Sequence, residues 1–182
     1  MTLQEYIDLA ARTCPDLGEK NNKYHMKMGV FTEVAEVVDI IKKHIAYGKP
    51  IDTVHLGEEI GDIMWYVANQ IRMNPDSPIL FSTILEKNLS SMAVLYKHAC
   101  YSWSSLIMVV RTLLSIKWSV RHHYWTFYLC VSLCKYFELD LEQICTTNIN
   151  KLKARYPDKF SNEAALNRNL DKERGILEDG LG

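Results

Sequence analysis

The sequence predicts an all-α protein, from the scarcity of its turn residues and the period of its apolar ones. Only 8 Gly and 5 Pro punctuate the 182 residues, and between them the apolar residues recur with a helical rather than an alternating period. Hydrophobic residues make up 48% of the chain and charged residues 24%, the balance of a globular protein with its own core. We expect a bundle of about five to six helices, with residues 1–160 forming a single domain.

Local signals place the first two helices. Thr2 and Glu5, three residues apart, form a capping box that starts a helix, which should stop near Pro15. A second helix should run from about residue 23 to residue 47 and end at Gly48, a residue type that suits the left-handed position after a helix.

Two further helices carry similar signals. Asp52 or Thr53 can cap a third helix, which should fade near residue 74. Asp140, with Gln143 three residues later, can cap a last helix that Pro157 stops.

Two segments lack such clear boundaries. Residues 75–137 form a long apolar helical segment, expected as two helices with a break near 117–123. Its part from 87 to 137 contains no Asp or Glu, which indicates a buried helical pair or a subunit interface, although some of its cations could bind phosphate instead. The polar C-terminal tail, 161–182, should be a solvated arm or a frayed helix.

The charge and the cysteine content limit the classes of protein to which the chain can belong. A formal net charge of -1 argues against a protein that grips polymeric nucleic acid, which needs a surplus of Lys and Arg. The 5 cysteines include no CxxC pair, and their odd number suits no complete disulfide framework, so we expect a reducing cytoplasm, the host's if the protein is viral. The N-terminus lacks the apolar stretch of a signal peptide, and no run is long enough to cross a membrane.

Two pairs of acids are the first candidates for chemistry. Glu33 and Glu36 lie three residues apart in FTEVAEVVDII, and Glu59 and Asp62 repeat this spacing in HLGEEIGDIMWYV. At about 100° per residue, each pair occupies the same flank of its helix's apolar stripe, so antiparallel packing can bring all four together. Four anions held close favour a divalent cation, and oxygen ligands suit Mg²⁺ or Mn²⁺ better than zinc.

Spacing alone also permits a simpler interpretation. Each acidic pair could be solvated and make local contacts with lysines such as Lys42 or Lys43. A basic face near the C-terminus is open to the same two interpretations: Asn148, Lys151 and Arg155, spaced three and four apart, could hold a phosphate chain or form a solvated helix end.

The order of these motifs resembles the MazG-like branch of the all-α nucleoside triphosphate pyrophosphohydrolases. ExxE at Glu33, ExxD at Glu59 and NxxKLxxRYPxxF from Asn148 follow in the family's order, over about residues 23–72 and 138–160. The resemblance implies a hydrolase that uses Mg²⁺, or Mn²⁺ as a substitute, to cleave a (d)NTP into a (d)NMP and pyrophosphate. It also implies a homodimer or a homotetramer.

The resemblance assigns roles to individual residues. Glu33, Glu36, Glu59 and Asp62 would bind the metal, and Glu33 or Glu36 is also the candidate catalytic base. Lys151 and Arg155 would bind phosphate.

The remaining candidates for substrate binding rest on weaker patterns. Either Trp65 or Tyr66 could stack on the base, although Trp65 could instead belong to the core. Tyr156 could cover the sugar or pack against Phe160. Asn69 or Asn148 could supply hydrogen bonds to the base. His55 stands where members of the family often have a lysine, and would bind phosphate only weakly or when protonated.

Two other functions stay open. The chain could be an enzyme of narrow specificity in the same superfamily, resembling the dimeric dUTPases or the dCTP pyrophosphatases. It could also be a catalytically inactive helical bundle that uses its apolar and aromatic segment to bind a partner protein.

Overall fold

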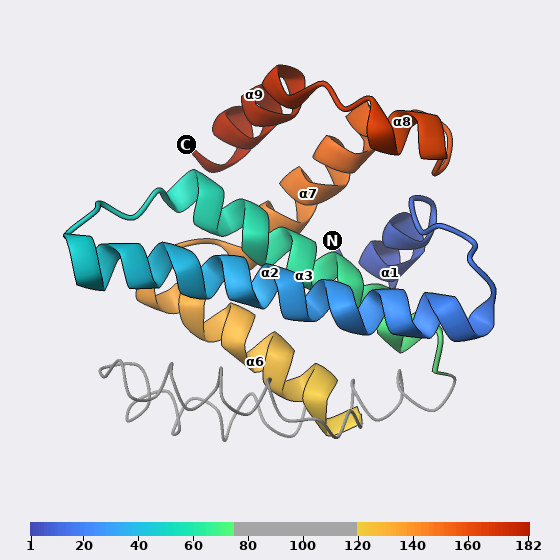
Figure 1. Cartoon of the computed structure of the whole chain (residues 1–182), viewed down its shortest axis with the longest axis horizontal. Coiled ribbons are helices and arrows are strands. Elements are labelled where there is room, and N and C mark those ends of the chain that lie inside the picture. The colour runs from blue at the N-terminus through green and yellow to red at the C-terminus, as the bar shows by residue number, and fades with distance from the viewer. Residues whose placement is uncertain (75–119) are drawn as a thin grey trace.

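The computed structural model describes residues 1–74 and 120–182, and this part of the chain consists of helices joined by short connections (Figure 1). The helices are α1 (Leu3–Ala11), α2 (Glu19–Tyr47), α3 (Thr53–Arg72), α6 (Val120–Tyr136), α7 (Leu141–Arg155), α8 (Asn162–Leu166) and α9 (Leu170–Leu181). The all-α class is thus confirmed. Of the predicted break at 117–123, residues 117–119 lie outside the described residues, as does the apolar segment from 75 to 119, and residues 120–123 belong to α6.

The predicted helix signals occur at the observed helix ends. The Thr2 side chain accepts a hydrogen bond from the Glu5 backbone, and the Glu5 carboxylate accepts one from the Thr2 backbone at 2.7 Å. Gly48 ends α2 in the left-handed conformation, with φ of 64°. Asp52 and Asp140 cap α3 and α7 through their side chains.

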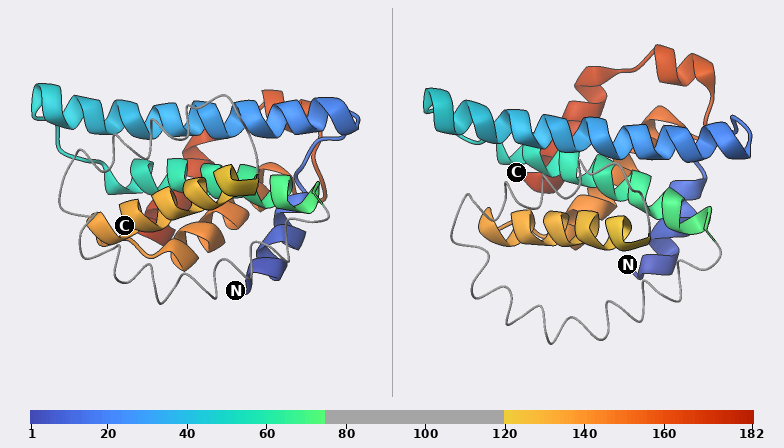
Figure 2. Two further views of the ribbon diagram at one scale, coloured as in Figure 1. Left: turned by 90° about the horizontal axis from the view of Figure 1, so that it is seen from below. Right: turned by 60° about the horizontal axis from the view of Figure 1, so that its bottom comes forward.

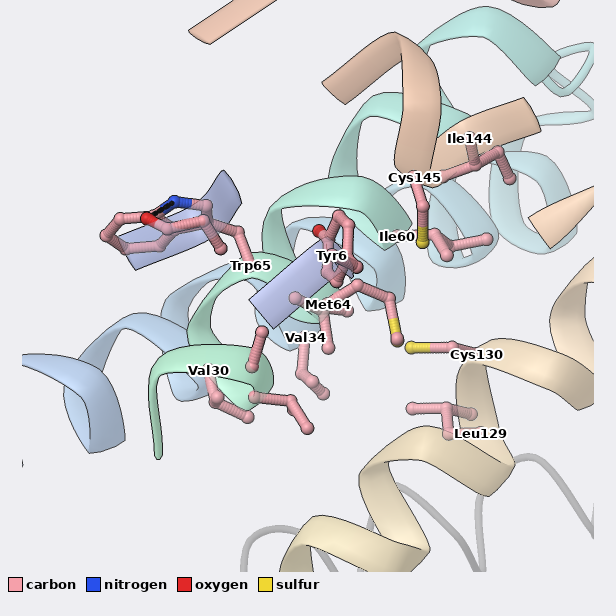
Figure 3. Packing of buried hydrophobic residues seen from close by; sticks show 14 of the residues in the cluster. Tyr6, Val30, Val34, Ile60, Met64, Trp65, Leu129, Cys130, Ile144 and Cys145 are labelled. Atoms are coloured by element: carbon pink, nitrogen blue, oxygen red, sulfur yellow. Dashed lines mark hydrogen bonds between the residues drawn. The ribbon is translucent and has the colours of Figure 1, made fainter. Parts of the chain in front are cut away.

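Helix α3 is the centre of the fold. It contacts α1, α2, α6, α7 and α9, and the views in Figures 1 and 2 show α2 running along it. Figure 3 shows how residues from several helices meet at α3: Met64 of α3 lies among Tyr6 of α1, Cys130 of α6 and Cys145 of α7. Burial of such side chains stabilises the fold by roughly 1.5–3 kcal/mol each. Because helices pack around α3, its side chains are held in defined positions, as a functional site requires.

The C-terminal segment is folded, which corrects the expectation of a solvated arm or a frayed helix. Helix α9 packs against α7 and α3, with Leu177 only 2% exposed. The Gln143 side chain donates to the Gly180 carbonyl oxygen at 2.7 Å. The polar composition of this segment concealed an amphipathic helix, whose few apolar residues lie on one face.

Within the residues that the structure describes, no helix is both long enough and apolar enough to cross a membrane.

Candidate active site

Helices α2 and α3 bring the four predicted acids to one cavity. The cavity has a volume of ≈ 610 Å³, and its lining includes Glu33 and Glu36 from α2 and Glu59 and Asp62 from α3. Glu36 is exposed, whereas Glu59 is only 8% exposed. The matched flanks of the two helices therefore do face a common space.

The lysines that might have neutralised these acids locally are engaged elsewhere. Lys42 and Lys43 both pair with Asp39, Lys43 at 2.5 Å, on the part of α2 that lies outside the cavity lining. The local lysine contacts of the simpler interpretation are thus made by Asp39 and not by Glu33 or Glu36.

Lys151 is a counter-ion to the acids from inside the protein. It is 0% exposed, and its Nζ donates to Asp62 Oδ2 at 2.7 Å and to Glu58 Oε1 at 3.1 Å. Burial by itself lowers the pKa of Lys151, but the charges and hydrogen bonds of Asp62 and Glu58 outweigh it and raise the pKa above its usual value. Lys151 does not line the cavity, and its contacts are with Asp62 and Glu58. The phosphate-binding role expected from the sequence stays a prediction.

Asn148 supports the same carboxylate. Its Nδ2 donates to Asp62 Oδ1 at 2.6 Å, and it is 2% exposed, away from the cavity lining. Helix α7 can approach α3 this closely because residue 61 is glycine: a Cβ on Gly61 would lie 2.9 Å from the Asn148 Cβ. The small residue in the EIGDIM motif is therefore part of how the site is built.

Two carboxyl groups share a hydrogen bond at the buried side of the cavity. Burial, followed by the hydrogen bond with Glu33, raises the pKa of Glu59 to about 9. Burial and the charge of Asp62 also raise the pKa of Glu33. His55 Nε2 lies 2.9 Å from Glu59 Oε1, so His55 contacts an acid of the site and does not line the cavity itself.

The carboxylates fit a divalent cation by their chemistry. Two neighbouring carboxylates repel each other when both are ionised, which agrees with the raised pKa values of Glu33 and Glu59, and a bound cation would remove that repulsion. No three His, Cys, Asp or Glu side chains within residues 1–74 and 120–182 stand in a ligand arrangement. The donors nonetheless are all carboxylate oxygens, which Mg²⁺ and Mn²⁺ prefer, and Glu33, Glu36, Glu59 and Asp62 could hold such an ion.

Guanidinium groups lie elsewhere on the cavity lining. Arg155, at the end of α7, donates to both carboxylate oxygens of Glu173, from Nε at 2.9 Å and from Nη2 at 2.5 Å. Arg168, from the connection between α8 and α9, binds the same carboxylate. The cavity thus combines an excess of carboxylates from α2 and α3 with cations from the C-terminal elements.

Aromatic side chains form another part of the wall. Trp65 is 7% exposed, and its indole nitrogen donates to Thr13 Oγ1 at 2.9 Å and to the Ala10 carbonyl oxygen at 3.1 Å, so it joins α1 to α3. Tyr66 stands edge-on to Trp65 and packs over Gly29, where a Cβ would lie 2.1 Å from the ring. Tyr66 is the more exposed of the two rings and offers a surface for a planar ligand.

Tyr156 and Phe160 also line the cavity and pack against each other, with ring centroids 5.4 Å apart. Tyr156 is only 6% exposed, which agrees with the packing role that the sequence left open.

Sequence reasoning missed Glu58, Arg168 and Glu173. Glu58 precedes Glu59 and lies one turn before Asp62, a spacing that could have revealed it. Tyr66 was expected together with Trp65 as a ring for the base, and only packing distinguishes the two. Arg168 and Glu173 come from a segment that carries no motif, so no sequence signal pointed to them.

The family comparison covers the helices that carry the acids. Residues 22–98 match the family of the MazG nucleotide pyrophosphohydrolase domain. No curated protein and no solved structure matches the chain. The matched range contains α3 and nearly all of α2, and hence every acid of the cavity, whereas α7 lies outside it. The motif from Asn148 lies outside the match, and the expected resemblance is confirmed for residues 22–98, which are a MazG nucleotide pyrophosphohydrolase domain.

Proposed function

We propose that the protein is a Mg²⁺-dependent pyrophosphohydrolase that cleaves a (d)NTP into a (d)NMP and pyrophosphate. The observation that carries the proposal is the cavity itself, in which Glu33, Glu36, Glu59 and Asp62 converge from two helices. The MazG family has nucleotides as substrates and typically uses a divalent metal. A volume of ≈ 610 Å³ lies in the range of pockets for small ligands, which supports a nucleotide as the ligand.

The residues of the chain divide the work of the reaction. Glu33, Glu36, Glu59 and Asp62 would hold Mg²⁺, which would neutralise charge on the substrate and lower the pKa of a water. Water attacks the α-phosphorus, and the bond from that phosphorus to the bridging oxygen breaks, so that pyrophosphate leaves. Glu36, the exposed acid, is our first candidate to accept the proton of the attacking water, and Glu33 the second.

Other residues act on the acids or on the ligand. Lys151 and Asn148 hold Asp62 in place from behind the cavity, which makes them positioning residues. Arg155 faces the cavity and would stabilise charge on the leaving pyrophosphate. Tyr66 would offer the base a ring surface, and Trp65 contacts that ring edge-on. The homodimer or homotetramer and the cytoplasmic location stay predictions.

Neutral substitutions of the acids test the proposal. Glu36→Gln and Asp62→Asn should each reduce pyrophosphate release from a (d)NTP with Mg²⁺ by at least about 100-fold, because each removes a charged ligand without changing its shape. Asp39→Asn is the matched control, since Asp39 lies on α2 but pairs with Lys42 and Lys43. Circular dichroism checks that each variant is folded, and full activity in both site variants would contradict the proposal.

A panel of nucleotides separates the broad enzyme from the narrow one. Comparable turnover of several bases would exclude an enzyme of the dUTPase or dCTP pyrophosphatase type, and turnover of one base alone would establish it. Thermal unfolding with Mg²⁺ and a nonhydrolysable nucleotide tests the inactive bundle, because only a protein that binds the ligand is stabilised by it.

A further inference from the structure

Two arginines share one buried carboxylate beside the cavity. Arg155 and Arg168 both bind Glu173, whose side chain is 5% exposed. The Arg155 contacts are 2.9 and 2.5 Å, and the shortest Arg168 contact is 2.6 Å. Burial by itself raises the pKa of Glu173, but the hydrogen bonds and charges of the two arginines outweigh it and lower the pKa to about 2. The cluster is therefore two cations on one permanent anion.

This cluster contains one more cation than anion. Arg155 alone satisfies both oxygens of Glu173 by its bidentate contact. The second guanidinium leaves the cluster with one unit of net positive charge. A guanidinium has five N–H donors, and the contacts of Arg168 with Glu173 use its Nε and one Nη group. Further donors of Arg168 are thus left for another acceptor.

The arginines of the cluster are accessible to an anion in the cavity. Arg155 and Arg168 both line the cavity into which the acids of α2 and α3 project. The Arg168 side chain is 39% exposed, so a ligand can reach it, while Glu173 is held beneath. A ligand that satisfies both parts of the cavity has one end that binds a divalent cation and another that carries negative charge, as a polyphosphate does.

We propose that Arg168 binds the two phosphates that leave as pyrophosphate, together with Arg155, and that Glu173 is a positioning residue that holds both arginines toward the cavity. The inference rests on the proposed function and deepens it, because it gives the C-terminal helix α9 a role in selecting triphosphates. A nucleoside monophosphate lacks the phosphates in question, so its binding should not depend on Arg168.

Binding of inorganic pyrophosphate tests the inference without any turnover. Isothermal titration of the full chain with pyrophosphate and Mg²⁺ should show an affinity at least about tenfold lower in Arg168→Gln than in the wild type, the loss of charge-assisted hydrogen bonds. Arg174→Gln is the matched control, since Arg174 lies on α9 and pairs with Glu178 and Asp52 outside the cavity lining. Equal affinities in the wild type and Arg168→Gln would overturn the inference.

Kinetics separate a ligand contact from a structural one. Arg168→Gln should raise KM for the triphosphate at least about tenfold and leave the affinity for the monophosphate product unchanged, and Arg168→Lys should recover part of the loss. Glu173→Gln should raise KM in the same direction, and if that variant fails to fold, Arg168→Gln decides alone. Equal weakening of monophosphate and triphosphate would overturn the inference.

The two proposals fail separately. A wild type that binds pyrophosphate through Arg168 but hydrolyses no nucleotide would refute the proposed function and support the anion site. A wild type that hydrolyses triphosphates while Arg168→Gln keeps its KM and its pyrophosphate affinity would support the function and refute the anion site.

Discussion

Replacement of Lys151 by methionine should destabilise the protein because it leaves two acids without their cation. Lys151 is 0% exposed and contacts Asp62 and Glu58, whose side chains are 27% and 20% exposed. Removal of one partner of a buried ion pair costs about 3–5 kcal/mol. Since both acids keep some access to water, we expect a loss of about 2–3 kcal/mol, equivalent to a decrease in Tm of roughly 5–10 °C for a protein of this size.

The assay is urea denaturation at neutral pH with a chelator present, repeated with Mg²⁺. The exposed Lys153 on the same helix provides the control, and Lys153→Met should change the free energy of unfolding by less than about 0.5 kcal/mol. Mg²⁺ should restore part of the stability of Lys151→Met, because a cation on Asp62 replaces the missing charge. A change below about 0.5 kcal/mol in Lys151→Met would refute the idea that Lys151 is the buried counter-ion of the site.

Three further predictions follow from the contacts. Gly61→Ala should destabilise the protein by about 1–3 kcal/mol, because its Cβ would meet Asn148 at 2.9 Å; Gly175→Ala, with open space around it, should be neutral or stabilising, and equal losses in thermal unfolding would contradict this. Trp65→Phe should cost about 1–2 kcal/mol, from two lost hydrogen bonds to α1, with kcat little changed. The metal-free protein should lose stability as the pH rises from about 5 toward 9, since folded Glu59 retains a proton that the unfolded chain has released; denaturation at several pH values that showed a rise would contradict this.

The fold was largely predictable where single residues carry the signal. The capping box at Thr2, the glycine at position 48 and the caps at Asp52 and Asp140 each depend on a contact between near neighbours in the sequence. The start of α2 was less predictable, because Gly18 precedes the helix without a side-chain cap, and the helix begins at residue 19. Boundaries without a local partner are thus the ones that sequence reasoning misplaces.

The position of the four acids was predictable because it depends on the local geometry of each helix. Helical periodicity fixes which flank Glu33, Glu36, Glu59 and Asp62 occupy, and the structure places all of them on one cavity. The role of Lys151 was not predictable, because sequence spacing gives its helical face but not whether that face is buried. Tertiary packing decides this, and α9 covers α7 from a segment whose composition resembles a solvated tail.

Hydrolysis in ¹⁸O-labelled water tests the central claim most directly. With Mg²⁺ and a (d)NTP, attack on the α-phosphorus by a water that Glu36 or Glu33 activates should place the label in the nucleoside monophosphate and leave the pyrophosphate unlabelled. Mass spectrometry of the products gives the answer. Label in released orthophosphate, with a nucleoside diphosphate as the other product, would contradict the proposed reaction.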